Sequence, residues 1–129
     1  MTAPAAPAAL RAGADGICAF EASVELIIAH ACWLDRDDFA DFIATVTSVT
    51  DSATEIALIN WPAAITALDA GELPCSSGER KLLQLAASLA CHIPVSLGAA
   101  VTGLDDRNIQ LLVGAILHAS GRRWHPPVP

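Results

Sequence analysis

The chain contains no tyrosine, one methionine and one lysine, and only 16% of its 129 residues are charged. It also lacks the short motifs that mark common active sites. There is no Gly-x-Ser-x-Gly nucleophile turn, no glycine-rich phosphate loop and no His-Glu-x-x-His zinc motif. These absences give no support to a motif-bearing hydrolase, nucleotide-binding enzyme or metalloprotease. We therefore expect a non-catalytic protein that uses no cofactor.

A secretion signal is also missing. Residues 1–16 hold alanine and proline, but no basic segment followed by an apolar core. We expect these residues to form a disordered lead-in and the protein to be cytoplasmic. Cysteines remain reduced in that compartment and behave as small buried apolar residues. We expect this of all four, which are Cys18, Cys32, Cys75 and Cys91.

Positive charge is scarce and unevenly placed. The net charge is −7, with eleven acids and two bases in residues 1–72, but three acids and five bases in residues 73–129. An acidic first half argues against a protein whose whole surface follows a phosphate backbone. The second half leaves a local nucleic-acid site open. The change of charge near residue 72 also marks a possible break between subdomains.

Apolar residues are plentiful, at 53% of the chain, against about 45–50% in average proteins. This excess favours apolar surface buried between chains as well as within one. Alanine supplies much of it, and arginine outnumbers lysine six to one, both of which are typical of high-GC bacterial genomes. Residues 82–104 carry no ionised side chain, but polar residues, Pro94 and two glycines interrupt them. We expect core helices there and no membrane span.

Helical periodicity dominates the first half, starting with a helix over 20–34. Asp35 is placed to begin a second helix, which ends within the β-branched run 45–50. The stripe expected to face the core in this second helix consists of Phe39, Phe42, Ile43 and Val46. A capping box of Ser52 and Glu55 predicts a third helix over 53–60, with a strand over 55–59 as the alternative.

Local signals are stronger in the second half. Asn60 as N-cap and Pro62 in the first turn predict a helix over 61–70. Ser76 and Glu79 form a capping box for a helix over 79–91. A short helix over 96–103 and a closing helix over 105–121 follow. The predicted fold is all-α, a compact bundle of six or seven short helices in one domain over 17–121, with the apolar closing helix at its centre and a flexible tail over 122–129.

The closing helix is apolar almost all the way round, which is typical of a central helix or a contact surface. Its main stripe consists of Ile109, Leu112, Val113 and Ile116. The tail adds Trp124 between basic residues, a combination common at interface hot spots. The sequence thus predicts a protein-interaction or regulatory module that binds itself, as a homodimer, or another protein. In that case Ile109→Asp or Ile116→Asp should collapse the protein.

The alternative is a helix-turn-helix transcriptional regulator, with the motif over 95–114. The small and apolar residues of that motif fall at Ala99, Gly103, Leu104, Ile109 and Leu112. The side chains available for base edges are Arg107, Asn108 and Gln110, and those for the DNA backbone are Arg80 and Lys81. Two acids, Asp105 and Asp106, precede Arg107 and oppose phosphate binding. Nucleic acid is therefore possible but not favoured, and helix packing explains the pattern better.

Metal sites are not predicted. Zinc ligands usually come as two close Cys or His pairs, and no such spacing occurs among Cys18, His30, Cys32, Cys75, Cys91 and His92. The acids from Asp35 to Asp41 lack the turn glycine of a calcium loop. They suit the first turn of a helix, with a solvated face that remains available for contact with a partner.

Overall fold

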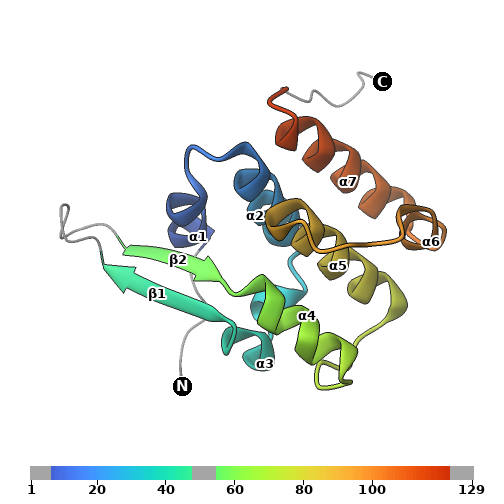
Figure 1. Ribbon diagram of the computed structural model, residues 1–129, viewed down its shortest axis with the longest axis horizontal. Helices are drawn as coiled ribbons and strands as arrows, with labels where there is room; N and C mark the ends of the chain where they lie inside the picture. Colours follow the sequence, from blue (N-terminus) through green and yellow to red (C-terminus); the bar gives the residue numbers. More distant parts are fainter. Residues whose placement is uncertain (1–6, 48–54, 123–129) are drawn as a thin grey trace.

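The computed structural model describes residues 7–47 and 55–122 (Figure 1). It is mostly helical, with a small two-stranded sheet. The helices are α1 (Pro7–Ala14), α2 (Cys18–His30), α3 (Asp37–Ala40), α4 (Trp61–Asp69), α5 (Ser77–Cys91), α6 (Leu97–Val101) and α7 (Asp106–Ala119). The strands are β1 (Ile43–Thr47) and β2 (Glu55–Ile59), and a 3-10 turn, η1, covers Trp33–Asp35. The mostly helical character of the fold is thus confirmed, but the all-α class is not.

Helix α2 is the centre of the fold. It packs against α1, α5 and α7, and it contributes buried residues from several sides, including Ala22, Val24 and Ile27. Helix α5 lies beside it and carries α4 on its other side (Figure 1). Trp33 and Phe39 are both fully buried in the core, and their ring centroids lie 5.5 Å apart. Such aromatic pairs add to the apolar burial that holds a small core together.

The prediction of a second helix through Phe42, Ile43 and Val46 is wrong. Helix α3 ends at Ala40, and residues 43–47 form β1, which pairs antiparallel with β2 from Ile43↔Ile59 to Thr47↔Glu55. β-Branched side chains pack well on a pleated strand and lose rotamer freedom in a helix. The helix predicted over 53–60 is also wrong. The alternative, a strand over 55–59, is confirmed as β2. Ser52 of the expected capping box lies outside the described residues.

Two further boundaries differ from expectation. Residues 7–14, expected to be part of a disordered lead-in, form α1, whose Leu10 is fully buried. The helix expected over 20–34 ends at His30, because Ala31 adopts a left-handed conformation with φ of 72°. That conformation closes a helix with an N–H donated back to a carbonyl of the last turn, here the carbonyl of Ile27.

The capped helices form where local signals place them. The Asn60 side chain accepts from the N–H of Ala63 at 3.2 Å and begins α4. The capping box of Ser76 and Glu79 is complete at the start of α5. Helix α6, expected over 96–103, is shorter. None of the helices among residues 7–47 and 55–122 combines the length and apolarity needed to cross a membrane.

Candidate docking surface on the last helix

Helix α7 has well-defined ends. The Asp105 carboxylate accepts from the N–H of Asn108 at 2.8 Å and caps the N-terminus. Asp106 lies in the first turn and His118 in the last, where each suits the helix dipole. Gly121, at φ of +87°, provides the left-handed residue after the helix. The closing helix expected over 105–121 is thus confirmed as α7, over residues 106–119.

The inner face of α7 packs on α2. Leu112 and Ala115 are buried there, and Leu111 and Ala119 are partly buried against the same core. Within the described residues, α7 contacts α2 far more than any other element, and it lies along the outer side of α2 in Figure 1. The expectation of a central closing helix is therefore wrong. The central helix is α2, and α7 lies against it as an outer helix.

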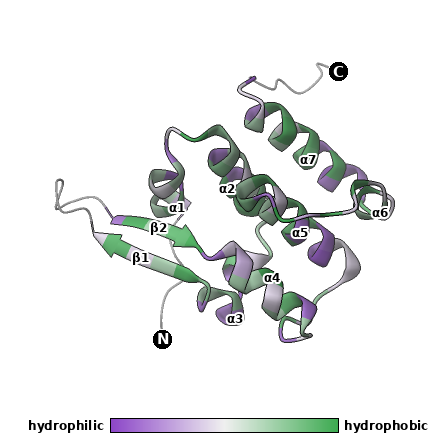
Figure 2. Cartoon of the chain, viewed as in Figure 1, coloured by the Kyte–Doolittle hydropathy of each residue, from purple (hydrophilic) through white to green (hydrophobic). Residues whose placement is uncertain are grey.

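The outer face of α7 is apolar and exposed. Val113 is 43% exposed and Ile116 is 46% exposed, while Ile109 is half-buried. Their spacing of four and then three residues places them along one side of the helix, which borders the buried side that holds Leu112 and Ala115. Figure 2 shows hydrophobic residues recurring along α7. We call the surface formed by Ile109, Val113 and Ile116 the α7 outer face.

Two polar contacts hold α7 on α2. Near its start, the Arg107 guanidinium donates to the carbonyl oxygen of Ala29 at 2.7 Å. Near its end, His118 Nε2 lies 3.0 Å from Glu21 Oε1. The hydrogen bond with His118 is the main cause that lowers the pKa of Glu21. A hydrogen bond from the main-chain N–H of Gly16 lowers this pKa further. Fixed at both ends, α7 presents its outer face as a rigid surface.

A groove of about 470 Å³ runs between α2 and α7, on the side of α7 turned away from the outer face. Its floor is formed by small and apolar residues, and its rim is polar. The lining residues are Ala22, Glu25, Leu26, Ala29, Gln110, Leu111, Gly114, Ala115, His118 and Arg122. Glu25 on the rim is already paired with Arg11, at 2.6 Å. The groove is therefore a surface separate from the α7 outer face.

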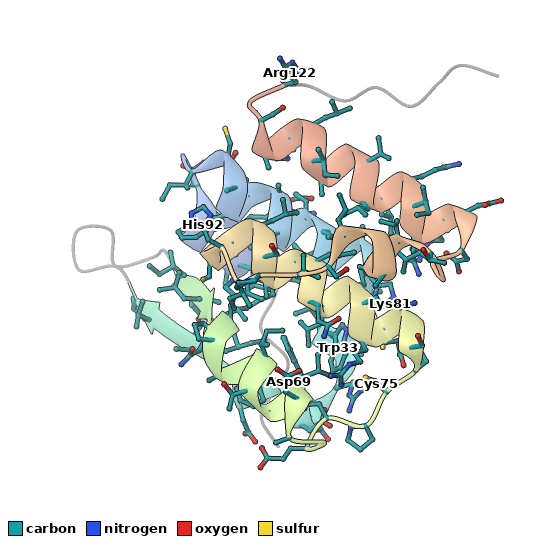
Figure 3. All side chains as sticks on the ribbon, turned by 45° about the vertical axis from the view of Figure 1, so that its right-hand side comes forward. Trp33, Asp69, Cys75, Lys81, His92 and Arg122 are labelled. Carbon is teal, nitrogen blue, oxygen red and sulfur yellow. The ribbon has the colours of Figure 1, made fainter. Side chains whose placement is uncertain are left out.

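The residues proposed for DNA reading do not share a surface. Arg107 is engaged with Ala29, and Asn108 is buried, with an Oδ1 that has no partner among the described residues. Gln110 lines the groove beside α2, but Lys81 lines a different one, between α4, α5 and α6. In Figure 3, Lys81 on α5 lies well apart from Arg122 at the end of α7. The fifth residue, Arg80, bonds to Asp69 at 3.1 Å and to the carbonyl oxygen of Leu68.

The two helices of the proposed motif, α6 and α7, pack mainly on other helices. Ala99 is exposed, and the five-residue α6 packs on α5 while α7 packs on α2. Gly103 gives space to a side chain of α5. A Cβ on Gly103 would stand 2.6 Å from Lys81 Nζ, so the turn makes room for a lysine side chain. The pattern over 95–114 therefore reflects packing within this fold.

The cysteines are free thiols, and no group of three or more His, Cys, Asp or Glu in the described part of the chain is arranged to hold a metal ion. One thiol has a defined partner, because Cys32 donates to the Glu79 carboxylate. Burial is the main cause that raises the pKa of Cys32 to about 11, and the hydrogen bond to Glu79 is the second. The same hydrogen bond is the main cause that lowers the pKa of Glu79 to about 2. Trp33 also donates to the carbonyl oxygen of Glu79, at 3.0 Å, so this corner is structural.

The other interface candidate, Trp124, lies outside the described residues. Sequence reasoning also missed one feature, the outer edge of β1. The signal was present as an uncharged, mostly β-branched run from Ile43 to Thr47, which was assigned to a helix. No protein-family model, curated protein sequence or solved structure matches this chain. Its function must therefore be argued from these surfaces alone.

Proposed function

We propose that the chain is a non-catalytic protein-interaction module in which the α7 outer face joins two copies as a homodimer. The observation that carries this proposal is the exposure of Val113 and Ile116 on one side of a helix whose other side is buried. Neighbouring apolar residues that stay in water cost free energy, which contact with a partner recovers. The spacing of Ile109, Val113 and Ile116 is also the alternating three-and-four spacing of a helix–helix seam.

The charges at the ends of α7 favour an antiparallel pair. Asp105 and Asp106 lie at its start, and Arg122 follows its end. In an antiparallel pair, the acidic start of one α7 lies near the basic end of the other, whereas a parallel pair places like charges together. An antiparallel arrangement also has the two-fold symmetry that most homodimers adopt. Ile109 of one copy then packs near Ile116 of the second.

The proposal is tested by measuring the mass of the full chain with multi-angle light scattering and native mass spectrometry. In dilute solution the wild-type chain should be a dimer, and the double variant V113E/I116E should be a monomer. Because both side chains are exposed, this variant should keep the circular dichroism spectrum and nearly the melting temperature of the wild type. That expectation reverses the sequence-based one, in which a charge at Ile116 collapses the fold.

Two control variants separate the surface from the core. Gln110→Glu changes an exposed residue of α7 outside the outer face and should leave the dimer intact. Leu112→Ala truncates a buried residue and should lower the free energy of unfolding by about 2–5 kcal/mol. A wild-type chain that is monomeric at all concentrations contradicts the proposal. So does a V113E/I116E variant that remains fully dimeric in dilute solution.

A further inference from the structure

The two edges of the small sheet are treated differently by the fold. The N–H of Asn60 donates to the carbonyl oxygen of Phe42 at 2.8 Å, just before the first ladder pair, Ile43↔Ile59. In antiparallel strands, hydrogen-bonded pairs alternate with pairs whose main-chain groups point away from each other. The pair Thr45↔Ala57 is therefore of the second kind. Ala57 directs its N–H and C=O to the outer edge of β2, and Thr45 directs its own to the outer edge of β1.

The outer edge of β2 is covered by α1. Gly13 meets the carbonyl oxygen of Ala57 so closely that a Cβ on Gly13 would stand 2.3 Å from it. The outer edge of β1 has no such cover among the described residues. Among those residues, no turn, loop or cap hydrogen bond joins the main chain of Ile43, Thr45 or Thr47 to another main-chain group. In Figure 1, β1 forms the outer strand of a sheet that projects from the bundle.

This open edge also lacks the usual protection. Natural edge strands carry lysine, proline or a bulge that prevents pairing with another chain. β1 reads Ile-Ala-Thr-Val-Thr, with no charge, no proline and an unbroken ladder to β2. Val46 is 49% exposed, and Leu58 on the neighbouring strand is 50% exposed. Both point to the sheet face opposite Ala57, so this face is apolar up to the open edge.

We propose that the outer edge of β1 pairs with β1 of a second copy, antiparallel and centred on Thr45, to form a continuous four-stranded sheet. The two β1 edges are complementary because the main-chain N–H groups of one copy face the C=O groups of the other, and these groups carry opposite partial charges. In this register the N–H and C=O groups of Ile43, Thr45 and Thr47 face those of Thr47, Thr45 and Ile43 of the second copy. None of these residues is charged, so two copies of net charge −7 meet along a neutral strand. Val46 lies opposite Ala44 of the second copy, which extends the apolar sheet face.

This contact goes beyond the proposed α7 dimer. β1 and α7 are separate surfaces, and within the described residues β1 packs chiefly on β2. A chain with two different two-fold contacts builds assemblies larger than a dimer, either a closed tetramer or an open row of copies. The edge contact is also expected where the α7 contact has been blocked.

The test uses position 45, which faces itself across the proposed two-fold axis. In the V113E/I116E background, the full chain should still form a dimer in concentrated solution. Adding Thr45→Asp places two carboxylates opposite each other and should raise the dissociation constant of that dimer at least about tenfold. Thr45→Lys places two ammonium groups there and should have the same effect. An equimolar mixture of the Asp and Lys variants should restore it as a mixed dimer, identified by its mass. Thr45→Val is the neutral control and should dimerise like its parent.

Each outcome separates this contact from the α7 dimer. A wild-type dimer that becomes a monomer in V113E/I116E, and stays a monomer in concentrated solution, supports the α7 contact and overturns the edge contact. Assembly in that background that is unaffected by Thr45→Asp also overturns the edge contact. Loss of the dimer in both charged variants without recovery in the mixture overturns the self-facing register. A wild-type chain that never associates overturns both proposals. Melting curves verify that the variants fold, and because the Thr45 side chain is exposed, these curves should overlap.

Discussion

Gly13 of α1 lies directly against the main-chain carbonyl oxygen of Ala57 in β2. A Cβ on Gly13 would stand 2.3 Å from this oxygen and 3.1 Å from Leu58 Cδ2. Gly13 is not among the residues with positive φ, so the fold needs this glycine for space and not for an unusual backbone conformation. The contact lets α1 cover the edge of β2 and bury Leu10. It explains why a segment without a strong helix signal is part of the folded domain.

Replacing Gly13 by alanine should therefore destabilise the protein, although alanine is the better helix former. We expect a loss of about 1–3 kcal/mol in the free energy of unfolding, because the new methyl group must displace α1 from β2. Urea unfolding followed by circular dichroism measures this loss. The matched control is Gly78→Ala in α5, where a Cβ meets open space and the higher helix propensity should add up to about 1 kcal/mol. Equal gains in both variants contradict the packing of α1 described above.

Stability should fall in acid as the Glu79 carboxylate is protonated. Its hydrogen bonds from Cys32 and from the main chain and side chain of Ser76 lower the pKa from 4.5 to about 2. A carboxylate with a lowered pKa contributes stability that is complete above its unfolded pKa. That contribution is lost as the pH falls from about 4.5 towards 2. Urea unfolding at a series of pH values measures it.

Glu79→Gln is the variant that isolates this charge, because the amide oxygen still accepts from the N–H of Ser76. It should be less stable than the wild type at neutral pH, and its stability should decline less steeply below pH 4.5. The pKa values of Glu21 and Asp38 are also lowered, so part of the acid sensitivity remains in the variant. Identical pH profiles for the two proteins contradict a stabilising role for the Glu79 charge.

The cysteines should react in an order set by exposure and by thiol pKa. Cys18 is exposed, whereas Cys75 is half-buried and burial raises its pKa. The exposure of Cys18 is contrary to the sequence-based expectation that all four cysteines are buried. Cys32 should react slowest of these three, because only a thiolate attacks an alkylating agent and its pKa is about 11. Mass spectrometry after timed alkylation of the folded protein measures the order, and Glu79→Gln should accelerate labelling of Cys32.

Fast labelling of Cys32 in the folded wild-type chain, at the rate found for Cys18, would contradict this order. Labelling in urea provides the reference, because all four thiols then have similar access to the reagent. A ratio of folded to unfolded rates for each cysteine removes differences in intrinsic reactivity.

Local sequence signals predicted the capped helices well. Asn60 with Pro62, and Ser76 with Glu79, satisfy N–H groups within a few residues of themselves, so their effect requires no distant partner. The Asp105 cap of α7 belongs to the same class. The candidate surface was predicted in part, since Val113 and Ile116 were correctly assigned to one stripe of the last helix.

The sheet and the position of α7 were beyond such signals. Ile43 and Val46 suit a helical stripe as well as a strand. A strand becomes stable only when β2, whose paired residues lie 8 to 16 positions further along the chain, supplies its hydrogen bonds. The apolar character of α7 likewise fits a central helix or an exposed face. Only packing decided between them, because α2 is buried by α1, α5 and α7 together, whereas α7 has α2 on one side and solvent on the other.

The sequence by itself therefore determined where most helices begin, which residues cap them and which apolar residues lie on a common face. The tertiary structure alone decided which helix is central, which strand edge is open and which apolar face stays exposed. The physical reason is the range of the interactions. Caps and helical periodicity act within one or two turns of chain, while burial depends on every element that reaches the same core.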